Sequence, residues 1–216
     1  AMFSWILNFI RRQGLVPALS ETERVALEAG SVWVEAEFFS GRPDFRRMLA
    51  EAWPALDARE RAFLDGPCEE ACRRVDPWQV TRTRELPEEA WRFLRENGFF
   101  GMTVPATYGG LGFSPLGVSA VIGKLATRSI PLSAVVLIPN SVGPAELIAH
   151  HGTEAQKRQW LPRLATGEEM PCFALTEPNA GSDAASIESS GTAFRAEDGA
   201  VRIRLAFSKR YITLAP

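Results

Sequence analysis

Apolar and polar positions alternate with a helical period through most of the first 170 residues. After Ser20 the apolar positions fall three or four residues apart, at Val25, Ala29, Val32 and Ala36. Ser20 and Glu23 have the spacing of a capping box, in which each side chain binds the backbone amide of the other residue. The pattern therefore predicts an amphipathic helix that begins at Glu21 and continues to Gly41.

The same period, interrupted by prolines and caps, predicts further helices downstream. Asp57 and Glu60 have capping-box spacing, as do Thr153 and Gln156, and Pro67 suits the first turn of a helix. The helices are expected over residues 44–53, 57–65, 68–75, 87–97, 115–127, 131–138, 143–151 and 153–167.

The period becomes strand-like at Pro171. Short apolar runs separated by turn residues predict antiparallel strands over residues 171–176, 192–195, 201–207 and 211–214. The predicted fold class is α+β, with helices first and an antiparallel β-domain after them. We assign residues 1–80 to an N-terminal helical extension, residues 81–170 to a helical domain and residues 171–216 to the start of the β-domain.

Residues 99–112 are rich in glycine but do not match a nucleotide-binding loop. Their spacing is not G-x-G-x-x-G, and they do not lie between a predicted strand and a predicted helix. We expect Gly109, Gly110 and Gly112 to allow close packing of the chain instead.

Charge and cysteine content narrow the classes of partner. The 216 residues include 24 basic and 26 acidic side chains, a net charge of -2, so there is no basic excess for coating a nucleic acid. Three cysteines do not make a disulfide framework. Cys68 and Cys72 share a helix face without a further Cys or His nearby in sequence, so we expect buried thiols and no metal site.

Residues 3–12 are apolar at first and end in Arg11 and Arg12. A bilayer span needs about 20 apolar residues, so this stretch is too short to cross a membrane. Its Trp and Phe side chains beside two arginines suit a membrane surface, and they suit packing on the helical domain equally well. We expect a cytoplasmic protein, with residues 3–12 either on the inner face of the membrane or packed on the protein itself.

Residues 173–186 combine a short apolar run with a polar turn. Gly181 lets the backbone approach a ligand closely, and Ser182 adds a hydroxyl, so that successive amides can converge on an anionic oxygen. A structural turn is the commoner role for a stretch of this composition. Composition alone leaves both roles open.

The same residues resemble the signature of the acyl-CoA dehydrogenases, and match Ala174-Leu-Thr-Glu-x-x-Ala-Gly-Ser-Asp-x-x-Ser186 at every fixed position. Further on, Lys209-Arg-Tyr-Ile-Thr resembles the Trp-Ile-Thr strand of the family, with Tyr211 in place of the usual Trp. Residues 19–67 are most similar to the long bacterial acyl-CoA dehydrogenases of fatty-acid β-oxidation. The resemblance implies the N-terminal portion of such an enzyme, truncated before its C-terminal helical domain.

The resemblance also implies a site for FAD. The implied cofactor-binding residues are Phe173, Leu175, Thr176, Ala180, Gly181, Ser182, Tyr211, Ile212 and Thr213. The first three would contact the isoalloxazine, the next three the pyrophosphate and the last three the face of the ring system. Ser182 would also lie near the CoA portion of the substrate, whereas Glu177 and Asp183 are interpreted as loop-stabilising carboxylates.

Members of the family remove two hydrogens across Cα and Cβ of an acyl-CoA thioester. A carboxylate takes the α-proton and the flavin accepts the β-hydride. In the family this base is a glutamate of the C-terminal domain, and no carboxylate of this sequence matches it. We therefore assign no catalytic residue, and we expect the 216-residue chain alone to be inactive.

The implied function is FAD-dependent oxidation of fatty acyl-CoA to trans-2-enoyl-CoA in β-oxidation. The implied electron acceptor is an electron-transferring flavoprotein, and the complete enzyme is expected to be a homo-oligomer. Two alternatives stay open: an acyl-CoA oxidase, which would produce hydrogen peroxide, and a non-catalytic acyl-CoA or partner-binding module of the same fold, which would bind acyl-CoA without flavin. We expect the sequence to be a piece of a longer product.

Overall fold

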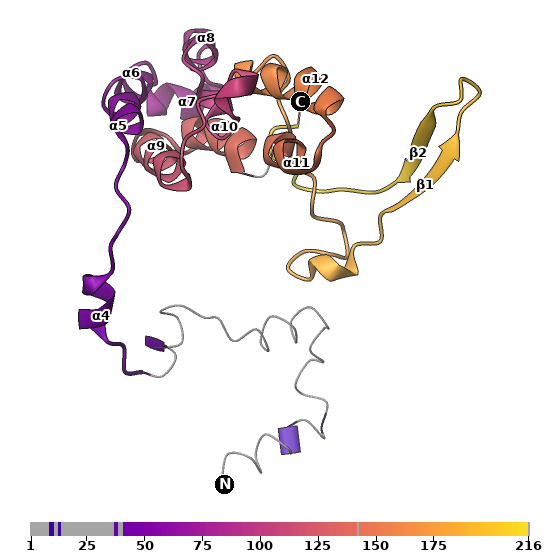
Figure 1. The fold of residues 1–216 in the computed structure, drawn as a ribbon, viewed down its shortest axis with the longest axis horizontal. Coiled ribbons are helices and arrows are strands. Elements are labelled where there is room, and N and C mark those ends of the chain that lie inside the picture. Colours follow the sequence, from indigo (N-terminus) through magenta and orange to yellow (C-terminus); the bar gives the residue numbers. More distant parts are fainter. Residues whose placement is uncertain (1–8, 11–12, 14–36, 39–40, 142, 216) are drawn as a thin grey trace. The chain divides into compact units, whose positions relative to one another are not determined.

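A computed structural model describes residues 9–10, 13, 37–38, 41–141 and 143–215 (Figure 1). Most of the helix predicted from Glu21 to Gly41 and most of the apolar stretch before Arg11 lie outside these residues. The chain divides into two units, Ala1–Trp53 and Pro54–Pro216. The predicted boundary near residue 80 does not coincide with this division, because the helices on both sides of residue 80 share one core.

The first unit contains helix α4 (Phe45–Ala50), which is shorter than the predicted 44–53. The carboxylate of Asp44 caps it by accepting from the amides of Arg46 and Arg47. Glu51 already has an extended backbone, which ends the helix three residues before Pro54.

The second unit is helical up to residue 166. Its helices are α5 (Ala58–Asp65), α6 (Pro67–Arg73), α7 (Pro77–Thr83), α8 (Glu88–Glu96), α9 (Pro115–Arg128), α10 (Ile130–Ser141), α11 (Pro144–His151) and α12 (Glu154–Thr166). Short 3₁₀ turns are η1 (Phe99–Gly101), η2 (Ala106–Tyr108) and η3 (Ala184–Ser186). Both predicted capping boxes are confirmed, at Asp57 and at Thr153.

Two features of these helices were not predicted. Helix α7 has Asp76 as its cap and Pro77 in its first turn, which are ordinary start signals. Pro162 is expected from its type to bend or restart the last helix. It lies inside α12 instead, and the helix ends where Gly167 adopts a left-handed backbone with φ of 71°.

The main core is built from α5, α6, α8, α9, α10 and the turn η1, and α7 adds Val80 to it (Figure 1). Its fully buried large side chains include Leu94, Phe99, Phe100, Leu125 and Leu132. A second cluster joins η2, α11 and α12 around Leu161. Both clusters consist of apolar side chains that the helices contribute. Burial of these side chains away from water stabilises the helical region.

Helix α9 also ties down the helices before it through polar contacts. Lys124 donates to the carbonyl of Leu64 at 2.9 Å, and Arg128 donates to that of Val75 at 2.9 Å. The Leu64 carbonyl lies in the last turn of α5, whereas Val75 follows α6. Arg128 also donates to the carbonyl of Cys72 in the last turn of α6, at 3.1 Å. The last turn of a helix leaves such acceptors free. Two basic side chains of α9 therefore cap the two helices.

Among the described residues, the run 130–151 is long and apolar enough to cross a membrane by length and composition. The structure divides it into α10 and α11, and more than half of it is buried in the protein. Such burial is typical of the core helices of a globular domain.

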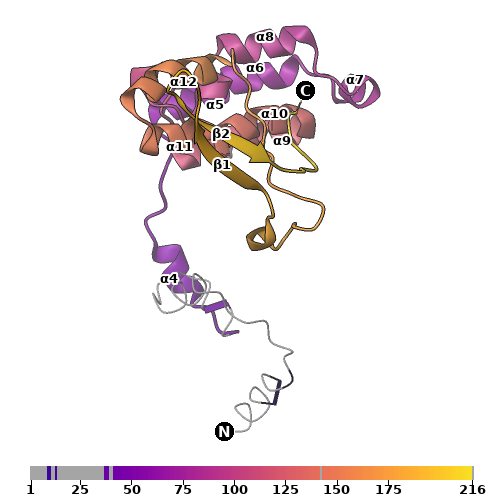
Figure 2. The same ribbon diagram turned by 90° about the vertical axis from the view of Figure 1, so that its right-hand side faces the viewer.

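Strands β1 (Ser190–Arg195) and β2 (Val201–Ala206) form an antiparallel hairpin, which Figure 2 shows from the side. Thr192 pairs with Arg204 in its register. These are the predicted strands 192–195 and 201–207, and the α+β fold class is confirmed.

The strands predicted over 171–176 and 211–214 are wrong. Only an isolated bridge between Phe173 and Thr213 joins these segments. Tyr211 and Leu214 have positive φ values of 54° and 62°, which an extended strand does not accommodate.

Candidate functional site

The two segments that the sequence singled out lie against one another. The amide of Phe173 donates to the carbonyl of Thr213 at 3.1 Å, and that of Arg210 donates to the carbonyl of Thr176 at 2.9 Å. Residues 173–176 and 210–213 are therefore held side by side by backbone bonds, although they are distant in sequence.

A tight turn follows the first segment. The amide of Glu177 donates to the carbonyl of Ala180 at 2.9 Å, and the amide of Ala180 donates back at 3.3 Å. Ala180 is buried, whereas Gly181 and Ser182 after it are exposed. The turn thus presents residues 181 and 182 to solvent.

This turn has the chemistry of an anion cradle. In the part of the chain that the structure describes, the amides of Gly181 and Ser182 donate to no other group. A side chain placed at Gly181 would meet nothing within 4 Å, so the backbone there faces open space. Free, neighbouring amides of this kind bind phosphate oxygens, so the residues present fit a pyrophosphate group.

The predicted ring-contacting side chains are accessible. Leu175 is 40% exposed and Tyr211 is 82% exposed. Thr213 is exposed as well, and Phe173, Thr176 and Ile212 are partly buried. An exposed aromatic ring beside apolar side chains offers a surface on which a planar ligand can stack.

The carboxylate of Glu177 fastens the turn from within. It lies 2.9 Å from Nζ of Lys209 and accepts from the amide of Glu188 at 2.8 Å and from the hydroxyl of Ser189. These bonds lower the pKa of Glu177 to about 2, with Lys209 as the largest cause. Glu177 is therefore ionised and fully engaged, which agrees with its predicted loop-stabilising role.

Asp183 has a similar local role. Its carboxylate accepts from the hydroxyl of Ser186, and its carbonyl accepts from the amide of Ser186 at 3.2 Å. Both bonds close η3, directly after the turn. Both motif carboxylates therefore make local bonds that stabilise the loop, as predicted.

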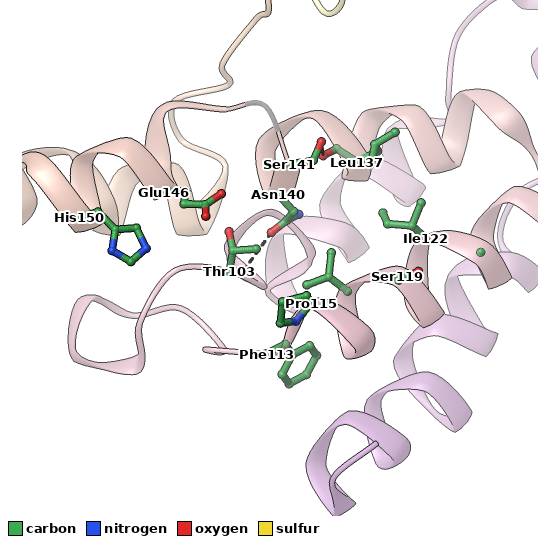
Figure 3. A pocket seen from close by; sticks show the side chains of 12 residues that line it. Thr103, Phe113, Pro115, Ser119, Ile122, Leu137, Asn140, Ser141, Glu146 and His150 are labelled. Atoms are coloured by element: carbon green, nitrogen blue, oxygen red, sulfur yellow. Dashed lines mark hydrogen bonds between the residues drawn. The ribbon is translucent and has the colours of Figure 1, made fainter. Parts of the chain in front are cut away.

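A pocket of about 680 Å³ lies among α9, α10, α11 and the loop before α9 (Figure 3). Apolar side chains such as Ile122 and Leu137 line one end, while Glu146 and His150 project from α11 at the other. Such a mostly apolar pocket with a few polar groups is typical of a small-molecule site. The sequence pattern did not identify these lining residues.

Asn140 shapes this pocket from the buried side. Its Nδ2 donates to the carbonyls of Phe99 and Val136 at 2.7 and 2.8 Å, and its Oδ1 accepts from the amide of Thr103 at 3.2 Å (Figure 3). The carboxamide thus joins α10 to the chain around η1. Its partners lie up to 41 residues away, so no local pattern could have identified it.

No group of three or more His, Cys, Asp or Glu side chains converges as a metal site within the described ranges. Cys68 is buried and donates to the carbonyl of Val121, and Cys72 donates to that of Lys124. Burial raises the pKa of Cys68 to about 12. The predicted role of both residues as buried, inert thiols fits these surroundings for Cys68 and in part for the less buried Cys72.

Comparison with known proteins shows which family the chain resembles. A family model described as "Acyl-CoA dehydrogenase, N-terminal domain" matches residues 56–168. The chain is 36% identical over 160 residues to the probable acyl-CoA dehydrogenase FadE10 of Mycobacterium tuberculosis, covering 72% of this chain and 24% of that protein. It is 35% identical over 115 residues to the mitochondrial very long-chain specific acyl-CoA dehydrogenase of Homo sapiens, covering 53% and 17%.

Solved structures agree. The acyl-CoA dehydrogenase of Geobacillus kaustophilus has a TM-score of 0.60 at 30% identity, over 73% of this chain and 40% of that one. The acyl-CoA dehydrogenase of Bacillus anthracis, solved with FAD, has a TM-score of 0.54 at 24% identity, over 72% and 26%; this second likeness concerns the fold alone. The chain spans about a quarter of FadE10 and less than half of these solved structures.

Proposed function

This chain belongs to the acyl-CoA dehydrogenase family, and we propose that it supplies the N-terminal helical domain and part of the FAD site of an enzyme that oxidises fatty acyl-CoA to trans-2-enoyl-CoA. The observation that carries the proposal is the turn at Gly181 and Ser182, whose free amides follow the segment 173–176. That segment is held by backbone bonds to Arg210 and Thr213 of the accessible segment 210–213.

The residues divide the work of binding FAD. The amides of Gly181 and Ser182 hold the pyrophosphate, and Leu175, Thr176 and Tyr211 hold the isoalloxazine. FAD, when bound, supplies an acceptor for the β-hydride of the substrate. The protein's part is to orient the ring and to hold it at the substrate.

The pocket lined by Ile122 and Leu137 suits the acyl chain of the substrate. Its apolar end excludes water from methylene groups, and burial of each methylene contributes about 0.8 kcal/mol. The human relative is named a very long-chain specific acyl-CoA dehydrogenase. That name supports a fatty acyl group as the substrate class.

We assign no catalytic base to this chain, because no carboxylate of its sequence matches the glutamate that serves as the base in the family. With a long-chain acyl-CoA as substrate, the 216-residue chain alone is expected not to reduce an electron-accepting dye. Dye reduction by this chain would overturn that assignment. In the working enzyme, an electron-transferring flavoprotein is proposed as the acceptor and β-oxidation as the pathway.

Titration of the chain with FAD, followed by flavin fluorescence, tests the proposal. Gly181→Glu places a carboxylate in the open space before the free amides. We expect about tenfold weaker binding or more, because the new charge repels the pyrophosphate.

Gln79→Glu is the matched control, since it adds the same charge at an exposed position of α7. Its FAD affinity is expected to equal that of the unaltered chain. Equal affinity of Gly181→Glu and the unaltered chain would show that the turn does not hold the phosphates.

A further inference from the structure

A nearly buried ion pair joins the two motif segments. The side chains of Lys209 and Glu177 are 11% and 7% exposed, and Nζ lies 2.9 Å from Oε1. Nζ also donates to the carbonyl of Leu175 at 3.0 Å. An ammonium that is largely removed from water is stable only with such partners, because its desolvation is costly. Lys209 is therefore fixed by contacts from the segment opposite it.

The position of this pair is central to the site. The backbone bonds from Arg210 to Thr176 and from Phe173 to Thr213 flank it. The ion pair is the side-chain contact between the segment that leads into the phosphate turn and the segment that carries the ring-facing residues 211–213. It therefore influences the distance between the two parts of the FAD site.

The pair also controls charge at the turn. Glu177 is the first residue of the turn whose free amides face solvent, and its pKa of about 2 keeps it ionised. Lys209 compensates this charge. Without the ammonium, the carboxylate keeps only the neutral donors of Glu188 and Ser189, and its negative charge repels an anionic ligand.

We propose that Lys209 is a positioning residue for the flavin, which holds Glu177 and the Leu175 carbonyl so that the phosphate turn and residues 211–213 meet one FAD molecule. The inference rests on the proposed function, because it requires that both segments bind FAD. It adds a residue outside the nine that the family resemblance implies, and it gives the Lys209 charge a role separate from its packing.

Three variants of the full chain separate charge from packing. Lys209→Met removes the ammonium and keeps most of the stem, and we expect it to weaken FAD binding about tenfold or more. Lys209→Arg keeps the charge and two donors, so it retains most of the affinity. Lys209→Met combined with Glu177→Gln removes both charges and recovers a large part of the loss.

Lys124 offers a matched control. Its Nζ lies 2.9 Å from a carboxylate oxygen of Glu69 and donates to the Leu64 carbonyl at 2.9 Å, which are the same two kinds of contact. Lys124→Met is expected to lower the midpoint of thermal unfolding and to leave the FAD affinity unchanged. Circular dichroism of each variant verifies that its helices are formed.

The outcomes are distinct. Equal FAD affinity of Lys209→Met and the unaltered chain overturns the proposal. So does a double variant that binds no better than Lys209→Met, because Lys209 then acts only through packing. If the unaltered chain binds no FAD, the proposed function itself is contradicted, and the variants are not needed to decide it.

Discussion

Glu60 shows how one side chain can connect two distant parts of the helical domain. It is 3% exposed, and its carboxylate accepts from the amide of Ser114 at 2.7 Å and from that of Asp57 at 3.0 Å. The first bond reaches the cap of α9 and the second closes the capping box of α5. The bond from Ser114 is the largest cause of a lowered pKa of Glu60.

Replacing Glu60 by Gln tests this link. A carboxamide has one acceptor oxygen, so one of the two amides loses its partner. We expect the free energy of unfolding at pH 6 to fall by about 1–3 kcal/mol, as for a buried unsatisfied donor. Denaturant unfolding of both proteins measures the difference.

The ionised carboxylate of Glu60 also predicts that the free energy of unfolding depends on pH. The pKa of Glu60 is lowered below its ordinary value of 4.5 in the folded protein. The ionised carboxylate therefore stabilises the fold at pH values above 4.5, and this stabilisation is lost as the pH falls through the lowered pKa. The difference in unfolding free energy between the wild type and Glu60→Gln should therefore be constant above pH 5 and shrink below about 4.5. A difference that grows on acidification would contradict the role of the ionised carboxylate.

Among the elements, the loop between η1 and α9 depends on glycines for two separate reasons. A Cβ at Gly110 would lie 2.1 Å from the carbonyl oxygen of Val104, so this position needs glycine for close packing, as predicted. Gly109 instead has open space around it and a φ of 84°. It therefore needs glycine for its left-handed backbone.

Substitution by alanine separates these reasons. Gly110→Ala is expected to destabilise the protein by about 1–3 kcal/mol, because backbone must move to admit the methyl group. Gly123→Ala, in the middle of α9 with nothing within 4 Å, should stabilise it by about 0.5–1 kcal/mol through helix propensity. Thermal unfolding measures both, and an equal sign for the two changes would contradict the packing argument.

Local chemistry decided which elements could be predicted. The capping boxes at Asp57 and Thr153 are made by residues three apart, so the sequence displays them directly. The strand expected at 211–214 failed because Tyr211 has a left-handed backbone, which its β-favouring side chain does not indicate. Helix α7 begins at the start signals of Asp76 and Pro77, but its 7 residues are too few to display a helical period.

For the whole molecule, the division after Trp53 coincides closely with the start of the family match at residue 56. Residues 54–216 are therefore expected to keep their helical fold when produced alone. Their midpoint of thermal unfolding should agree with that of the full chain, as measured by circular dichroism. Loss of the helical signal in the shorter protein would show that residues 1–53 complete its core.

The candidate site was only partly predictable at this scale. The motif identified Gly181 and Tyr211 because their spacing is fixed along the chain. The ion pair joins Glu177 to Lys209, 32 positions away, and a carboxamide bond joins Asn140 to Phe99, 41 positions away. Hydrophobic periodicity and capping signals are local patterns, so they do not predict contacts over such separations. Pocket walls made by three helices are likewise a product of packing.

The contacts between α9 and the helices α5 and α6 form late during synthesis of the chain. The contacts of Ser114 with Glu60, Lys124 with Leu64 and Arg128 with Val75 span 54, 60 and 53 residues. A ribosome adds about 5–20 residues per second, so α5 and α6 leave it roughly 3 to 11 s before α9 exists to cover them. During that interval the apolar faces of α5 and α6 are open to chaperones. The main core is complete only after α10, which supplies Leu132 and Val136, has emerged as well.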